Sequence, residues 1–220
     1  MNTLIGVNNS DNFSELKQNF GNPLRALVTD SQEIADEWFW TNKFFEFFRK
    51  KRGYDVRKFL PVCFVPNRDN QFIEVFFQNE KPCFEFPEDN IGKRVRHDWL
   101  KTLTELWNRE FIEYISKWGE NYGIKHRIQT YGMPIDVLQT FGSSDIPETE
   151  TLFAGSIDFF KLASSAAITY EKSIVSSETF SWFKRDGTLL PLKWKFACDR
   201  LFMAGINQHV YHGWTYFERD

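Results

Sequence analysis

The sequence predicts an α/β fold of the TIM-barrel-like (β/α)8 type, with a β-hairpin excursion from it. Short apolar runs alternate with longer helical patterns, and strands separated by single helices form right-handed units around a parallel sheet. Polar residues follow each apolar run, as they do at the rim of a barrel that builds an active site. A doubly wound sheet is the alternative, but the chain has no GxGxxG or GxxxxGKS/T phosphate-binding loop.

The first predicted strand covers residues 25–31, which are apolar and then abruptly polar, as in a buried parallel strand that ends at a functional rim. A helix is expected from Thr41, whose hydroxyl can cap its first turn, to Gly53, which ends it. Basic residues 50–52 complement the dipole at that end of the helix, so they do not require a nucleic-acid partner.

Residues 61–97 break the alternation and are expected to be a β-rich insertion. Within it, residues 72–77 and 83–86 have the composition of the two strands of a hairpin. A long helix is expected to follow Asp98, a good N-cap, because apolar residues then recur at helical spacing. The stripe that we expect to face the core comprises Trp99, Leu103, Leu106, Trp107, Phe111, Tyr114, Ile115 and Trp118.

The second half of the chain repeats the alternation of strand and helix, with an acidic segment at residues 145–150. The expected strands are 125–132, 173–178 and 208–213, and the expected helices are 135–140, 159–170 and 191–205. A full barrel needs eight strands and about 250 residues, which is more than these runs provide. The barrel is therefore incomplete, or weak strands lie within residues 1–23 and 61–97.

The chain has 220 residues, 42% of them hydrophobic, which suits a single partial barrel domain over residues 1–220 and excludes a disordered tail. A net charge of −3 disfavours a nucleic-acid binder. The three cysteines include no CxxC pair and require no disulfide framework. Neither a membrane-spanning apolar run nor a signal peptide at residues 1–12 is expected, so the compartment is not determined.

Carboxylates lie near the ends of the predicted strands, and parallel neighbouring strands would bring them to one rim. Glycoside hydrolysis uses two such groups, a protonated acid that donates to the leaving oxygen and an ionised partner that activates water or attacks the sugar. Glu178 is the best candidate acid, because it follows an apolar strand and the small serines before it leave room for a ligand. The alternative is that these carboxylates are ordinary solvated surface charges. The candidates are Asp30, Glu33, Asp145, Glu148, Glu150 and Glu178.

The histidines do not suggest a metal site. His209 and His212 are expected on opposite faces of one strand, and His97 and His126 are isolated, which disfavours zinc. Clustered acidic side chains would instead suit Ca²⁺. No GxSxG nucleophile elbow is present. An aromatic content of 18%, with 8 Trp, is a weak indication of rings that stack on sugars.

Several motifs occur in a fixed order between residues 25 and 214. They are Thr29-Asp30-Ser31-Gln32-Glu33, Arg52-Gly53-Tyr54-Asp55, Phe59-Leu60-Pro61, Gln129-Thr130-Tyr131-Gly132, Asp145-Ile146-Pro147-Glu148-Thr149-Glu150, Ser177-Glu178-Thr179-Phe180, Ala204-Gly205-Ile206-Asn207-Gln208 and Tyr211-His212-Gly213. As an ordered set, they resemble the family 106 glycoside hydrolases, which are α-L-rhamnosidases.

The resemblance implies a (β/α)8 catalytic domain that hydrolyses terminal α-L-rhamnosides with inversion, and a Ca²⁺ that contacts sugar hydroxyls. Glu178 resembles the general acid and Glu33 the base that activates water. Glu150, with Glu148 as the second choice, resembles a metal or substrate ligand. The residues expected to bind substrate are Asp30, Gln129, Tyr131, Asn207 and His212.

Two alternatives to an active enzyme remain open at this point. Members of the resembled family are longer than this chain, so a non-catalytic carbohydrate-binding protein or a truncated, inactive homologue would use the same cleft. If the barrel is open, an apolar flank would also favour self-association. In each case the expected partner is a rhamnose-containing glycan, and neither nucleic acid nor a membrane is expected.

Overall fold

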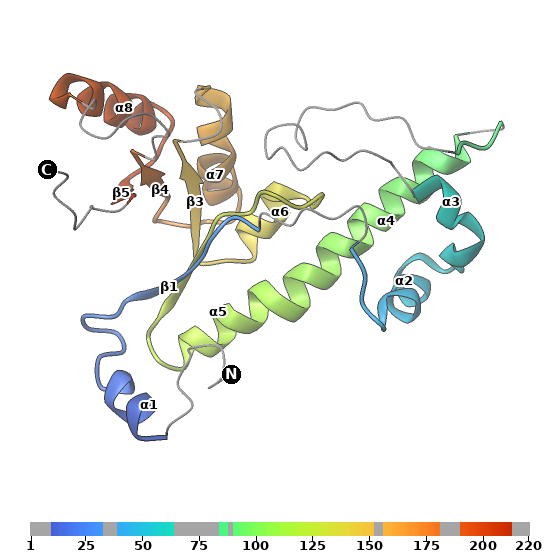
Figure 1. Cartoon of the computed structure of the whole chain (residues 1–220), viewed down its shortest axis with the longest axis horizontal. Helices are drawn as coiled ribbons and strands as arrows, with labels where there is room; N and C mark the ends of the chain where they lie inside the picture. The colour runs from blue at the N-terminus through green and yellow to red at the C-terminus, as the bar shows by residue number, and fades with distance from the viewer. Residues whose placement is uncertain are drawn as a thin grey trace, which may run out of the picture.

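A parallel sheet organises the computed structural model, which describes residues 10–32, 39–63, 84–87, 90–151, 156–180 and 190–212. Neighbours in the sheet follow the order of the chain, β1-β2-β3-β4-β5, and every pairing is parallel (Figure 1). The strands are β1 (Ala26–Thr29), β2 (Lys125–Ile128), β3 (Ile146–Glu150), β4 (Ser176–Thr179) and β5 (Gln208–Tyr211).

The five strands curl into a half-barrel, which confirms the predicted α/β class and the parallel topology. Each crossover between successive strands from β2 onward contains a helix, as right-handed parallel connections require. The closed ring of eight strands stays a prediction. The assignment of residues 1–220 to one domain is likewise untested.

Helices provide the outer layer and a separate helical lobe. They are α1 (Ser10–Lys17), α2 (Phe44–Arg52), α3 (Leu60–Cys63), α4 (Ile91–Trp107), α5 (Glu113–Glu120), α6 (Val137–Gly142), α7 (Ile157–Thr169) and α8 (Pro191–Met203), with a 3₁₀ turn at Val56–Phe59 and a π-helical turn at Asn108–Ile112. Figure 1 shows α4 and α5 as one long rod, with α2 and α3 beside its first half.

Helix α2 forms where the sequence predicted it, but Thr41 is not its cap. Lys43 occupies the N-cap position without a side-chain capping bond, while the Thr41 carbonyl accepts the Phe44 amide at 2.9 Å. Gly53 ends the helix as predicted. It has a φ of 82°, and its amide donates to the Arg49 carbonyl, which is the left-handed C-terminal cap that glycine favours.

The long helix begins before Asp98, so the predicted start was wrong. It starts at Ile91 after Asn90, which has the left-handed φ of 55°. Asp98 lies inside α4, and its carboxylate accepts the hydroxyl of Tyr54 at 3.0 Å instead of capping a helix end. Because the Asp98 carboxylate binds Tyr54, it does not cap a helix, and the sequence pattern misplaced the start of α4.

Most of the apolar stripe on this helix faces the core, but Tyr114 does not. Trp99, Leu103 and Leu106 are buried, whereas Tyr114 is 57% exposed. The π-helical turn at Asn108–Ile112 adds backbone to one turn and shifts the phase of the residues that follow. The prediction assumed a regular α-helical period through this turn, so it wrongly placed Tyr114 on the face toward the core.

Strand β3 was not predicted, because the sequence showed residues 145–150 only as an acidic segment. All five of its residues are nevertheless buried. The strand pairs on both sides, with β2 and with β4, which closes the gap that the sequence reading left in the sheet. Buried carboxylates in a central strand are rare unless they have partners, so this strand indicates where polar contacts concentrate.

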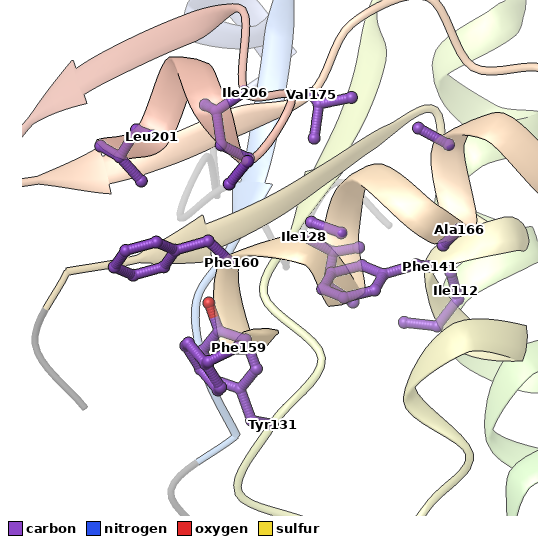
Figure 2. Close-up of a cluster of buried hydrophobic side chains, with 13 residues drawn as sticks. Ile112, Ile128, Tyr131, Phe141, Phe159, Phe160, Ala166, Val175, Leu201 and Ile206 are labelled. Atoms are coloured by element: carbon purple, nitrogen blue, oxygen red, sulfur yellow. The ribbon is translucent and has the colours of Figure 1, made fainter. Parts of the chain in front are cut away.

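Two hydrophobic clusters stabilise the fold. The first joins α6, α7 and α8 to the sheet, and Figure 2 shows how Ile128, Val175 and Ile206 gather with Phe141 and Phe160. The second packs α2 and α3 on α4, and its fully buried members are Phe44, Phe48 and Val62. The first cluster fixes the outer face of the strands, so their inner face is left for other contacts.

The first strand of the predicted hairpin, residues 72–77, lies outside the described residues, whereas residues 84–86 of the second are described and are not in a strand, so that part of the prediction was wrong. Of the expected insertion at 61–97, the described ends are helical up to Cys63 and from Ile91 onward. For the residues of this insertion outside the described ranges, the β-rich structure stays a prediction.

The surface of α8 is strongly apolar. Leu192, Phe196 and Met203 are 76%, 64% and 73% exposed. An exposed flank of this kind was expected of an open barrel, and self-association through it stays a prediction. Among the helices that the structure describes, none is long and apolar enough to cross a membrane.

His126 links β1, β2 and α5 on the outer face of the sheet. Its ring nitrogens lie 2.8 Å from the Thr29 hydroxyl and 3.2 Å from the Ser116 hydroxyl, and the residue is 1% exposed. Burial lowers the pKa of His126 from 6.5 to about 4, although the nearby Asp145 opposes this shift. The neutral ring is therefore the form that the folded state holds.

We predict that this histidine makes the fold sensitive to acid. The unfolded chain takes up the proton near pH 6.5 and the folded chain only near pH 4, so the free energy of unfolding falls between these values. The loss is about 3 kcal/mol at the lower end. Urea denaturation at several pH values from 7 to 4 would give the free energy of unfolding of the wild type and of His126→Gln. The free energy should fall more steeply with decreasing pH in the wild type than in the variant.

The matched control is His97→Gln, because the His97 side chain is 72% exposed. Its pH dependence should follow the wild type. If His126→Gln retains the full dependence, the stability change comes from other groups.

Candidate functional site

The inner face of the half-barrel carries a cluster of polar side chains. Side chains alternate along a strand, and paired residues of parallel strands share a face. Glu148 pairs with Ser176, and Glu150 with Glu178. The residue after β2, Gln129, continues the same face from Arg127. Three strands therefore direct carboxylates and their hydrogen-bonding partners to one place.

Glu178 is the centre of this cluster. Its Oε2 accepts a hydrogen bond from Gln129 Nε2 at 2.6 Å, and its Oε1 contacts Nδ1 of His212. The two partners come from the ends of β2 and β5, on either side of β3 and β4. The Glu178 side chain keeps 19% of its surface exposed, so it is both held and accessible.

Glu148 lies deeper, at 1% exposure, and its carboxylate is fully engaged. Oε2 accepts the Ser176 hydroxyl at 2.7 Å and lies 3.0 Å from the Arg127 Nε, while Oε1 lies 3.3 Å from Gln129 Nε2. Burial raises the pKa of Glu148, and the hydroxyl, the guanidinium and the amide oppose that rise. The neighbouring Glu178 carboxylate raises it further.

Of two other predicted residues, Glu150 lies at this site and Tyr131 supports it from the hydrophobic core. Glu150, the last residue of β3, is 3% exposed and is the register partner of Glu178. Tyr131 is buried, donates its hydroxyl to the Glu148 carbonyl at 3.1 Å and packs on Phe159. Burial raises the pKa of Tyr131 well above its ordinary value, so its hydroxyl remains protonated. It supports the backbone of β3 from the hydrophobic core.

The contacts that the structure shows for the remaining described candidates are with other residues. Asp30 is exposed after β1, and its Oδ1 accepts the Ser31 amide at 2.8 Å. Asn207 precedes β5 at the other end of the sheet, where its amide bridges the Val175 amide and the Ser173 carbonyl at 2.9 and 2.8 Å. Glu33, the expected base, lies outside the described residues.

Asp145 also lies at the far end, because it precedes β3. Its Oδ2 accepts the His126 amide at 2.7 Å, which gives it a structural contact between β2 and β3. Of the acids in the segment 145–150, only Glu148 and Glu150 reach the inner face.

Sequence reasoning missed Arg127 and Ser176. Both carried a signal, because each stands two positions before a predicted site residue on a predicted strand, and side chains two apart share a face. What the sequence could not provide was the strand pairing that places both of them against Glu148.

The acidic side chains were predicted to suit calcium. The Glu148 carboxylate does not fit this role well, because a guanidinium already lies at Oε2 and a cation there would meet like charge. Among the described residues there is no group of three or more His, Cys, Asp or Glu side chains placed to hold a metal. Calcium binding stays a prediction.

Comparison with known proteins shows the family of this chain. A family model described as alpha-L-rhamnosidase, of glycoside hydrolase family 106, matches residues 10–217. The chain belongs to this family. The motifs that suggested the resemblance therefore mark a real relationship across almost the whole chain.

Two individual relatives show how much of a family member this chain represents. A rhamnosidase structure from Novosphingobium sp. PP1Y superimposes with a TM-score of 0.71 at 22% identity, over 99% of this chain and 20% of that one. A curated protein of Formosa agariphila, named as a candidate beta-glucuronidase, is 24% identical over 203 residues, 89% of this chain and 15% of its own length. The chain thus spans a fifth or less of either relative.

We predict that Arg127→Met destabilises the fold by about 3 kcal/mol, because it leaves the buried Glu148 carboxylate without its cation. Adding Glu148→Gln should restore part of the loss, since the charge is then removed. Urea denaturation at pH 7 measures both effects. Lys195→Met breaks the exposed pair with Asp199 and serves as the control, with an expected change within about 1 kcal/mol. Equal losses for the two single variants would contradict the prediction.

Proposed function

We propose that this chain carries the acid side of a glycosidase active site that hydrolyses terminal α-L-rhamnosides. Family membership supports a glycoside hydrolase acting on carbohydrate. The observation that carries the proposal is the placement of Glu178, an accessible carboxyl group held by Gln129 and His212 at the end of a central strand. A held and accessible carboxyl group is what a general acid requires.

In the proposed reaction, protonated Glu178 donates its proton to the glycosidic oxygen as the bond from that oxygen to the anomeric carbon breaks. The leaving group departs as an alcohol. Glu33 is the proposed base, and it takes a proton from water as the water oxygen bonds to the anomeric carbon from the opposite face. This route inverts the configuration, and it needs about 6.5–9.5 Å between the two carboxyl groups.

Other side chains of the inner face have supporting roles in the proposal. Arg127 and Ser176 neutralise and fix Glu148, so that a second buried carboxylate can stand beside the acid. Glu150 is the proposed ligand for substrate hydroxyls or for calcium, which would supply charge to orient those hydroxyls.

We predict that Glu178→Gln reduces the hydrolysis of an aryl α-L-rhamnoside by about 10² to 10⁴-fold, because the amide has no acidic proton to deliver. The measurement is release of the aryl alcohol under saturating substrate. Glu120→Gln, at an exposed position in α5, is the matched control and should keep full activity.

Calorimetric titration with L-rhamnose separates the proposal from its alternative. If Glu178→Gln hydrolyses the aryl rhamnoside as fast as the wild type does, Glu178 is not the general acid. Binding of rhamnose without any turnover by the wild type would favour a non-catalytic carbohydrate-binding protein.

A further inference from the structure

The side chain of Gln129 bridges two carboxylates. Its single amide nitrogen lies 2.6 Å from Oε2 of Glu178 and 3.3 Å from Oε1 of Glu148. An amide nitrogen carries two hydrogens, so it can donate one to each carboxylate. Gln129 is 1% exposed, and both of its donors are directed at protein atoms. It therefore has no donor left for a sugar hydroxyl.

The orientation of this amide follows from its neighbours. If its oxygen faced the two groups, each contact would need a protonated carboxyl group whose O–H pointed at Gln129, whereas the amide nitrogen can donate to an oxygen of either group in both protonation states. With nitrogen inward, both facing oxygens must accept, so neither Glu178 Oε2 nor Glu148 Oε1 can carry a proton directed at Gln129. Glu148 is fixed on its other side by Ser176 and Arg127. The contact with Glu148 therefore anchors the Gln129 amide, and its second N–H is directed at Glu178.

We infer that Gln129 is a positioning residue, anchored through Glu148, that holds Oε2 of Glu178 as an acceptor and leaves Oε1 as the oxygen that carries the transferable proton. Oε1 is the atom that contacts His212 Nδ1, at the open end of β5. The proton is consequently presented on the side of Glu178 away from the buried Glu148. The transfer of this proton to a glycosidic oxygen rests on the proposed function. The hydrogen bonds of Gln129 to the two carboxyl groups rest on the geometry alone.

The first test needs no turnover. In a ¹⁵N-labelled protein, the side-chain amide pair of Gln129 is identified by its disappearance in Gln129→Met. We expect its two protons to exchange with water at least about tenfold more slowly than those of the exposed Gln18, because both are buried and hydrogen-bonded. Glu178→Gln should move the Gln129 resonances and leave those of Gln18 in place.

Exchange as fast as that of Gln18, or resonances that do not respond to Glu178→Gln, would overturn the bridge. If Gln129→Met does not fold, Gln129→Asn identifies the pair by replacing its resonances, so the assignment stays independent of Glu178→Gln, and Gln18→Met identifies the reference.

The second test separates positioning from substrate binding. Gln129→Met has a similar length but no donor, and we expect it to lower kcat by about tenfold or more with KM changed by less than about twofold. Gln18→Met should match the wild type. An increase in KM at unchanged kcat would mean that Gln129 contacts substrate and would overturn the inference.

The two tests fail separately from the proposed function. A wild-type chain that does not hydrolyse rhamnosides contradicts the proposed function, while the exchange and shift measurements still decide whether Gln129 holds Glu178. A wild type that hydrolyses rhamnosides but shows a freely exchanging Gln129 amide supports the function and rejects the bridge.

Discussion

The buried carboxylate of Glu148 is the constraint on which the inner face of this half-barrel depends. A charge at 1% exposure is costly unless it is paired and hydrogen-bonded, so β2 and β4 must hold the register that brings Arg127, Gln129 and Ser176 to it. Once those contacts form, a change of register among β2, β3 and β4 would leave the Glu148 carboxylate buried without partners. The same contacts place Gln129 beside Glu178, which connects the stability of the sheet to the geometry of the candidate acid.

The two faces of the sheet have separate tasks. Outward residues such as Ile128 pack against the helices in the first hydrophobic cluster, and His126 forms hydroxyl contacts to β1 and α5. Inward residues carry the carboxylates. Because strand side chains alternate, one short strand can serve both tasks, and β2 does so within four residues. The chemistry is therefore supported by a scaffold whose apolar packing lies on the opposite side of the strands.

Sequence patterns located most elements and the acids that matter, but they did so unevenly. Glu178, Gln129 and His212 were singled out and do come together, whereas Asn207 shares a motif-rich segment with His212 and yet lies at the opposite end of the sheet. The reason is the length of β5, which separates the two residues along its axis. Strand β3 escaped detection, because propensity describes an Ile-Pro-Glu-Thr-Glu segment as a loop unless the partners of its carboxylates are known.

The sequence by itself determined the class of the fold, the family and the identity of the candidate acid, since alternating strand and helix patterns and short ordered motifs are local properties of the chain. Only the tertiary structure decided the register, the burial of Glu148 and the bridge through Gln129. These depend on contacts between residues 19 to 49 positions apart, and hydrogen-bond geometry across neighbouring strands is not encoded in any single segment. Tyr114 is exposed for a different reason: one π-helical turn shifts the helical period that the sequence presents as regular.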